Sequence, residues 1–196
     1  MKLEEGVLNI EKKLSGLDQL VLDFLRVLES ENVEYVIVSG YVAILTGRSR
    51  GTEDIDVIIQ SLGKKKTESL VERLSEDYWC INSGEQEIYS MLEDDLAVRF
   101  AEKDDIIPNF EVRFATDSLE KEALSERLTV RIDSREIFIS PLELQIAYKL
   151  YLSSEKDFED ALHLFNVFED SLEIEKLENY CKKLKVKEDL DELREA

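Results

Sequence analysis

One stretch in the first third of the chain constrains the fold more than any other feature. Residues 35–38, Tyr-Val-Ile-Val, form an apolar and largely β-branched run of strand length. Ser39-Gly40 ends this run, and residues 41–45 then have the composition of a short helix. A second apolar run follows at 55–59. A strand, a tight turn, a short helix and a second strand in such close succession predict a fold that mixes α and β structure.

The rest of the first 139 residues continues this alternation. Residues 17–30 carry apolar side chains at helical spacing, and residues 110–115 alternate between apolar and charged side chains as a half-buried strand does. Further helices are expected over 67–75, 86–92 and 118–127, and further strands over 79–81, 96–100, 128–132 and 136–139. We therefore expect an α/β domain at 1–139, with N-terminal helices.

The pattern becomes entirely helical after Ser140. The sequence Ser140-Pro141-Leu142-Glu143 predicts a helix start, in which Ser140 accepts a hydrogen bond from the Glu143 amide and Pro141 takes the first helical position. Helices are expected over 141–153, 157–168 and 174–184, followed by an acidic tail. This change of pattern predicts a C-terminal helical subdomain at 140–196.

Charge and composition exclude several classes of protein. The 196 residues include 45 acidic and 25 basic side chains, and the resulting net charge of −20 opposes sequence-independent binding to extended duplex nucleic acid. One histidine and two widely separated cysteines exclude a His-rich metal centre and a Cys-x-x-Cys site. No apolar run has the length of a membrane span, and the acidic N-terminus lacks the apolar segment of a secretory signal, so we expect a cytoplasmic protein without membrane contact.

The turn between the first strand and the short helix is suited to phosphate. Backbone N–H groups at such a turn attract anions, Gly40 lets a ligand approach the backbone, and Ser39 adds a hydroxyl donor. Arg48 and Arg50 follow on a loop. The stretch therefore predicts a site for phosphate groups.

Two aspartates lie at the start of the second strand. Asp54 and Asp56 are separated by one residue, so their side chains share one face of the strand. Two neighbouring carboxylates are tolerated if they are exposed or if a divalent cation bridges them, and Mg²⁺ binds through carboxylates and phosphate oxygens. Both interpretations stay open for the pair alone, because acidic pairs such as Asp94-Asp95 are frequent in this chain.

The combined pattern resembles the first motif of the nucleotidyltransferase superfamily of the DNA polymerase β type. It is most similar to the AbiEii-type nucleotidyltransferases, the toxins of certain toxin–antitoxin systems. In that family a strand ends in Gly-Gly or Gly-Ser, a short helix follows, and Arg-x-Thr-x-Asp-x-Asp opens the next strand. Ser39-Gly40 stands at the first position, with Ser in place of the first Gly. The second motif corresponds to Arg50, Thr52, Asp54 and Asp56. The resemblance implies an α+β fold, with a small mixed sheet flanked by helices and a helical part behind it.

The superfamily has a third carboxylate on a later strand, and two residues are candidates for it. Glu111 lies in the middle of an expected strand and points away from its apolar face, whereas Asp117 lies just beyond that strand. The family pattern favours Glu111, although the family usually has Asp there. The alternative is that Glu111 is a solvent-facing charge paired with a neighbour such as Arg113.

A second region of resemblance lies in the helical part. AbiEii-like proteins have a lysine inside the helix that Ser-Pro opens, and a Lys/Arg-Asp-x-x-Asp pattern on the next helix; Lys149, Asp157 and Asp160 match these positions. The resemblance implies that Lys149 contacts the triphosphate. Alternatively, Lys149 is an ordinary surface lysine, and Asp157 caps a helix with Asp160 in its first turn. His163 is more consistent with a surface or core residue than with a catalytic one.

Taken together, the resemblance implies an enzyme that moves a nucleoside monophosphate from a nucleoside triphosphate to an acceptor hydroxyl. The metal would be Mg²⁺ or Mn²⁺, held by the catalytic carboxylates Asp54, Asp56 and Glu111. The nucleotide-binding residues would be Ser39, Gly40, Arg48, Arg50, Thr52, Lys149, Asp157 and Asp160. The acceptor could be an RNA end such as that of a tRNA, a protein or a small molecule, and a toxin would have an antitoxin partner. The alternative is a weak or inactive protein of the same fold that binds a nucleotide or a partner.

Overall fold

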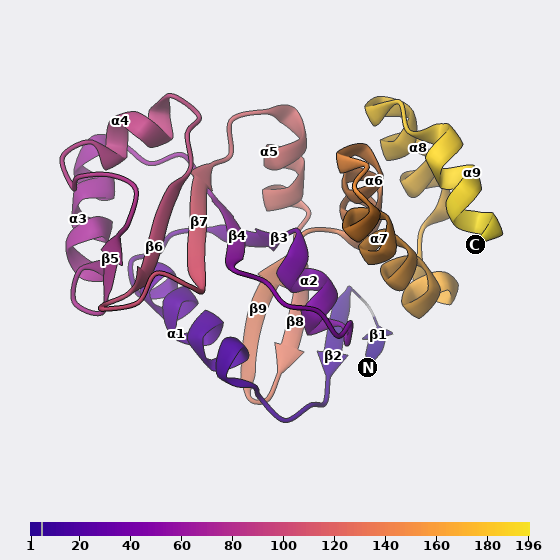
Figure 1. The fold of residues 1–196 in the computed structure, drawn as a ribbon, viewed down its shortest axis with the longest axis horizontal. Coiled ribbons are helices and arrows are strands. Elements are labelled where there is room, and N and C mark those ends of the chain that lie inside the picture. Colours follow the sequence, from indigo (N-terminus) through magenta and orange to yellow (C-terminus); the bar gives the residue numbers. More distant parts are fainter. Residues whose placement is uncertain (5) are drawn as a thin grey trace.

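A central mixed β-sheet organises the fold of this protein (Figure 1). The computed structural model describes residues 1–4 and 6–196. The strands follow one another across the sheet in the order β1-β2-β8-β9-β3-β4-β7-β6-β5. Their bounds are β1 Lys2–Glu4, β2 Val7–Ile10, β3 Tyr35–Val38, β4 Asp54–Ile59, β5 Tyr78–Cys80, β6 Val98–Glu102, β7 Asn109–Phe114, β8 Leu128–Ile132 and β9 Arg135–Ile139. The mixed sheet flanked by helices is confirmed, and it is larger than expected.

The N-terminus differs from the expectation. The expected N-terminal helices are, within the described residues, a single helix, α1 (Gly16–Ser30), and two short strands precede it. β2 pairs in parallel with β8, and the side chains of Leu8 and Ile10 are buried there. Four residues carry too little periodicity to indicate a strand, and the pairing partner lies more than a hundred residues away, so the sequence alone gave no sign of it.

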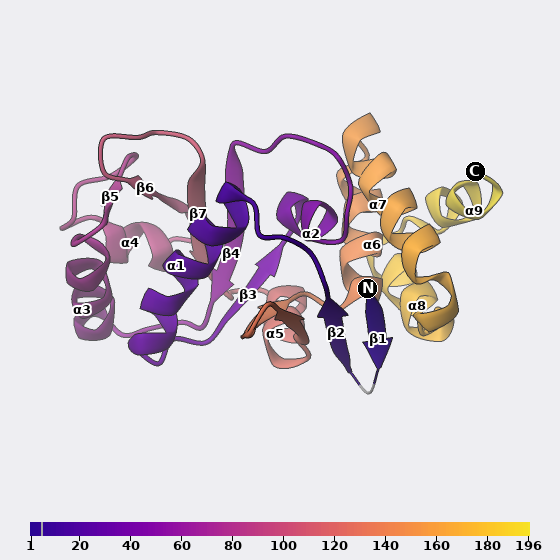
Figure 2. The same cartoon turned by 90° about the horizontal axis from the view of Figure 1, so that it is seen from below.

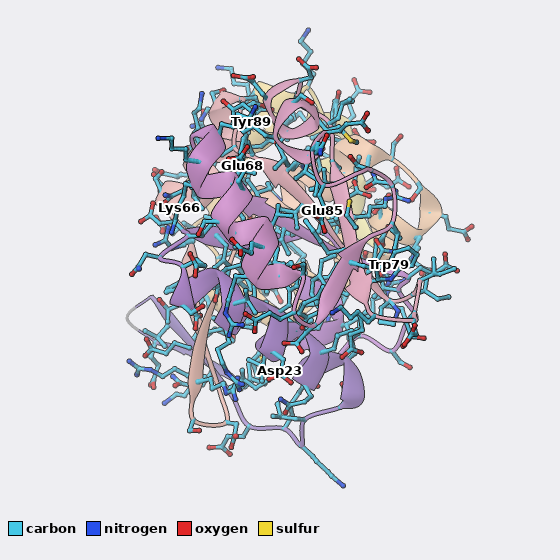
Figure 3. All side chains as sticks on the ribbon, turned by 90° about the vertical axis from the view of Figure 1, so that its left-hand side faces the viewer. Asp23, Lys66, Glu68, Trp79, Glu85 and Tyr89 are labelled. Atoms are coloured by element: carbon cyan, nitrogen blue, oxygen red, sulfur yellow. The ribbon has the colours of Figure 1, made fainter. Side chains whose placement is uncertain are left out.

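α1 covers one face of the sheet, and aromatic packing fixes it there. The ring of Phe24 on α1 stacks on the ring of Phe110 on β7, with 3.8 Å between the centroids and 6° between the planes. α3 (Lys64–Leu74) and α4 (Ile88–Glu93) lie at the same end of the molecule as β5 and β6. Figure 3 views the molecule from this end, with Lys66 and Glu68 on α3 in the foreground. Trp79, labelled in the same view, belongs to β5, the last strand of the sheet.

The residues after β9 form four α-helices and one short 3-10 helix, Glu169–Ser171, and they lie at the opposite end of the molecule (Figures 1 and 2). They are α6 (Leu142–Leu152), α7 (Glu155–Phe168), α8 (Ile174–Leu184) and α9 (Lys187–Glu195). The acidic residues at the C-terminal end are helical, as expected for a solvated helix over 173–194, but α9 also buries Leu190 and Leu193. None of the helices in the described part of the chain is long and apolar enough to cross a membrane.

The start of α6 also differs from the expectation. Pro141 is the N-cap residue rather than the first helical residue, and no side chain caps the helix. The Ser140 hydroxyl is oriented toward the Pro141 carbonyl, and the Glu143 carboxylate accepts a hydrogen bond from the Glu173 amide at 2.9 Å. The Glu143 side chain therefore forms a hydrogen bond between α6 and the residue before α8, and it does not form a capping box.

Candidate active site

Three carboxylates form a row across two neighbouring strands. Asp54 and Asp56 both belong to β4, and Asp56 pairs in register with Glu111 on the parallel strand β7. The residues that alternate with them, Ile55 and Phe110, are fully buried on the face that α1 covers. Because side chains alternate between the two faces of a sheet, the three carboxylates lie on the other face.

The pKa of Asp56 reflects its burial and the two neighbouring carboxylates. Its pKa is raised from 3.8 to about 6, first by burial and then by the negative charges of Asp54 and Glu111, while hydrogen bonding from Ser39 opposes the shift. A divalent cation would relieve both causes, since it replaces the lost hydration and neutralises the repulsion. The oxygen donors of Asp54 and Asp56 fit Mg²⁺, which uses one or two carboxylates and completes its shell with water and phosphate oxygens.

Glu111 is held by a residue that the sequence did not indicate. Arg99 pairs with Glu111 across β6 and β7, and its Nε and Nη2 donate to Glu111 Oε2 at 3.0 and 2.7 Å. Within residues 1–4 and 6–196, no three His, Cys, Asp or Glu side chains are grouped closely enough to hold a metal ion. The bonds from Arg99 end on Oε2, so Oε1 of Glu111 is the atom that could accept a proton.

The Ser39-Gly40 turn lies next to this row. β3 is antiparallel to β4, and Val38 pairs with Asp56, so the turn begins beside the carboxylates. α2 (Gly40–Leu45) starts at the turn, as expected for a strand followed by a short helix. Ser39 has φ 63° and ψ −133°, a backbone conformation that favours glycine. Ser39 is therefore a strained residue, at a position where glycine would adopt the same conformation without strain.

The second group of predicted residues forms a buried ionic cluster. Asp160, with no exposed surface, accepts hydrogen bonds from both Arg48 and Arg50, and its carboxylate lies 3.0 Å from the Lys149 ammonium. Lys149 is 2% exposed and also contacts Asp157 at 2.5 Å. These five residues, which the resemblance assigned to nucleotide binding, lie together in the structure, where the three cations pair with carboxylates of the same chain. Their nucleotide-binding role stays a prediction.

Asp157 belongs to the helix start, although it does not cap it. Ser154 is the N-cap of α7 and accepts a hydrogen bond from the Asp157 amide at 3.1 Å, so the alternative of Asp157 as the cap is wrong. Burial by itself would raise the pKa of Asp157, but hydrogen bonds from Lys149 and Ser154 outweigh it and lower the pKa below its usual value. Asp157 is therefore an ionised partner of Lys149.

The remaining predicted residues have local roles that the structure makes plain. The Thr52 hydroxyl donates to the Asp54 carbonyl at 2.8 Å and thereby orders the start of β4. Asp117 caps α5 (Ser118–Ser125) by accepting from the Leu119 and Glu120 amides, which favours Glu111 as the carboxylate beside Asp56. His163 Nε2 lies 3.2 Å from the Thr46 carbonyl, as a satisfied structural histidine would.

A cleft opens on the sheet face that carries the carboxylates. About 430 Å³ of space, part of it open to solvent, lies between the sheet, α5 and α6. Val38 and Ile58 form its floor, and Tyr148 and Gln145 line it from α6. Val38 directly precedes Ser39, so the cleft begins at the turn. The sequence did not indicate this cleft, because its walls on α5 and α6 lie 59 or more residues after the floor residues Val38 and Ile58 along the chain.

Comparison with solved structures shows a nucleotidyltransferase-like fold, as the sequence predicted. ANT(2")-Ia, solved in complex with adenylyl-2"-tobramycin, is 17% identical to this chain over 87% of this chain and 98% of its own, with a TM-score of 0.57. An antigenic nucleotidyltransferase-like protein from Paracoccidioides brasiliensis is 17% identical over 93% and 94% of the two chains, with a TM-score of 0.53. No family model and no curated protein matches the sequence. The closer similarity to AbiEii-type proteins stays a prediction.

Proposed function

We propose that this protein is a nucleotidyltransferase that uses a divalent metal and a nucleoside triphosphate. One observation carries the proposal: the Ser39-Gly40 turn and the carboxylate Asp56 lie side by side through the β3–β4 pairing, with Asp54 and Glu111 on the same sheet face. A phosphate site adjacent to a row of carboxylates is the arrangement that phosphoryl transfer requires. The shared fold of the nucleotidyltransferase-like structures supports the same activity.

The turn would hold the phosphates. The Gly40 amide is the first of its helix and has no intrahelical acceptor, so it is available to an anion. Arg50 packs against Gly40 so closely that a Cβ there would lie 2.9 Å from Arg50 Nη2. Of the three predicted cations, Arg50 is therefore the one best placed beside the phosphates. Lys149 would act indirectly, since its ammonium is buried between Asp157 and Asp160.

The carboxylates would act on the reacting atoms. Asp54 and Asp56 would hold Mg²⁺ or Mn²⁺, which when bound supplies Lewis-acid stabilisation of the phosphoryl oxygens. The acceptor hydroxyl oxygen forms a bond to the α-phosphorus while the bond to the departing pyrophosphate breaks. The hydroxyl proton passes to a carboxylate of the row, and Glu111, with Oε1 free of the contact to Arg99, is our candidate for this role.

The cleft between α5 and α6 would receive the nucleoside part of the nucleotide. It begins beside the turn, its floor is apolar, and the Tyr148 ring lines it. Replacing Tyr148 with alanine is expected to weaken triphosphate binding about 10-fold, because aromatic stacking on a base contributes about 1–3 kcal/mol. Equilibrium titration with each of the four triphosphates checks this. Tyr151, exposed and 5.9 Å from Tyr148 between ring centroids, is the matched control. Equal losses in the two variants would argue against this position of the nucleoside.

The acceptor is expected to be neutral or cationic rather than an RNA end. The net charge of −20 repels a polyanion and attracts amines. ANT(2")-Ia, which was solved with an adenylylated tobramycin, offers a precedent for a small acceptor on this fold. The tRNA-end and protein acceptors implied by the AbiEii resemblance, and a toxin role with an antitoxin partner, remain secondary proposals. Harmless overexpression of the protein would count against the toxin role.

Pyrophosphate release tests the proposed activity. The purified protein is incubated with each triphosphate, Mg²⁺ or Mn²⁺, and pools of amine-containing small molecules, tRNA or protein. Release that requires both metal and acceptor is the expected result. Triphosphate binding without release under any of these conditions would instead favour the alternative, a protein of this fold that binds nucleotides without turnover.

A further inference from the structure

The backbone of Ser39 is held in a conformation that serine disfavours. Its φ of 63° and ψ of −133° are close to those of the first central residue of a type II′ turn, a position that glycine dominates. Serine has a Cβ that strains this conformation, so some other part of the structure must stabilise it. No capping hydrogen bond from the Ser39 side chain to α2 does so.

Gln145 supplies that stabilisation from the helical end of the molecule. The Ser39 amide donates to Gln145 Oε1 at 3.1 Å, and Gln145 Nε2 donates to the Ser39 carbonyl at 2.9 Å. The side chain is 2% exposed, so water does not compete freely for either bond. One amide group thus satisfies both backbone groups of a strained residue that lies 106 positions earlier in the chain.

These two hydrogen bonds, which we call the Gln145 clamp, also set the direction of the Gly40 N–H group. In a trans peptide the C=O and the following N–H point in opposite directions. Because Gln145 binds the Ser39 carbonyl, the Gly40 N–H points away from Gln145. Rotation of this one peptide would remove the Gly40 donor from the phosphate site without displacing Asp54 or Asp56.

We propose that Gln145 is a positioning residue, which holds the Ser39-Gly40 peptide in the orientation that binds the phosphates of the nucleotide. The proposal rests on the proposed function. Gln145 does not touch the reacting atoms; it acts through the backbone of the turn. The helical end of the molecule, which the sequence predicts as a separate subdomain, therefore determines whether the phosphate site on the sheet is formed.

A double-mutant cycle tests this role. Gln145→Ala is expected to weaken binding of Mg²⁺ with a non-hydrolysable triphosphate about 10-fold or more, the effect of losing one hydrogen bond to a charged group. Ser39→Gly removes the strain, so Gln145→Ala in that background should weaken binding about 3-fold or less. Gln60, whose Oε1 accepts from the Glu34 amide at 3.3 Å, gives the matched control Gln60→Ala, with unchanged affinity expected. Equal losses in the serine and glycine backgrounds would overturn the proposal.

A ligand-free crystal structure separates this proposal from the proposed function. Gln145→Glu is close in shape to the native side chain, but it places an oxygen against the Ser39 carbonyl, so it should rotate the Ser39-Gly40 peptide. An unchanged Ser39 backbone in both Gln145 variants would overturn the clamp, whether or not the protein binds nucleotides. A wild-type protein that binds no triphosphate would instead overturn the proposed function, and with it the role of Gln145 toward phosphate.

Discussion

Replacing Asp56 with asparagine is expected to abolish nucleotidyl transfer and to stabilise the metal-free protein at the same time. The variant loses a proposed metal ligand, and the loss of several kcal/mol of transition-state stabilisation corresponds to a rate that is lower by about 10³-fold or more. The same change removes a buried negative charge beside Asp54 and Glu111, which is the reason for the raised pKa of Asp56. Few substitutions are expected to raise stability while they remove activity, so the combination is diagnostic of this site.

The stability gain has a defined pH dependence. The Asp56 carboxyl has a pKa of about 6 in the folded protein and 3.8 as its ordinary value. Between pH 3.8 and about pH 6 the folded protein binds more protons at Asp56 than the unfolded chain does. The contribution of Asp56 to the free energy of unfolding therefore falls as the pH rises through this range, and it is constant above about pH 6. Two pKa units correspond to about 3 kcal/mol. Urea denaturation in EDTA should therefore show Asp56→Asn more stable at neutral pH by up to about 3 kcal/mol, with the difference disappearing toward pH 4.

Asp191→Asn is the matched control for this prediction. Its side chain is 59% exposed on α9, far from the carboxylate row in the sequence, and it should change neither activity nor the pH dependence of stability. If Asp56→Asn keeps full pyrophosphate release, Asp56 is not a metal ligand. If the variant is less stable than the wild type across the whole pH range, Asp56 is not a crowded carboxylate.

Asp160→Asn is expected to destabilise the protein more than any other single change at the site. The neutral amide cannot balance Arg48, Arg50 and Lys149, and Lys149 is buried. Removing one partner of a buried ionic cluster costs about 3–5 kcal/mol, a large part of the typical stability of a domain. The free energy of unfolding, measured in urea at neutral pH, should fall by that amount.

The neighbouring residue provides the comparison. Glu159 pairs with Arg48 in the same cluster, but its side chain is 58% exposed. Glu159→Gln should therefore lower the free energy of unfolding by about 1 kcal/mol or less. Similar losses in the two variants, or a loss below about 1 kcal/mol for Asp160→Asn, would show that the cluster does not hold α7 to the loop that contains Arg48 and Arg50.

The sequence predicted the features that depend on the spacing of neighbouring residues. Period two placed Asp54 and Asp56 on one face, and the structure confirms that geometry. The turn at Ser39-Gly40, the short helix behind it and the hairpin of β8 and β9 were also readable, because each depends on a few consecutive residues. The metal-binding and nucleotide-binding roles of these residues remain predictions.

The rest depends on contacts between distant segments, which one sequence does not reveal. The partner of Ser39 is Gln145, 106 positions later, and nothing in the α6 pattern distinguishes this glutamine from a surface residue. Arg99 was not singled out, because its contact with Glu111 requires the register of β6 on β7. The burial of Lys149 was also unexpected, since a lysine at the edge of an apolar stripe usually reaches solvent.

A crystal structure of the protein with Mg²⁺ and a non-hydrolysable triphosphate tests the central claim most directly. The account predicts a metal ion bound by Asp54 and Asp56, with phosphate oxygens on the same ion and at the Gly40 amide. A triphosphate bound elsewhere, or bound at the turn with no metal at the two aspartates, would contradict it.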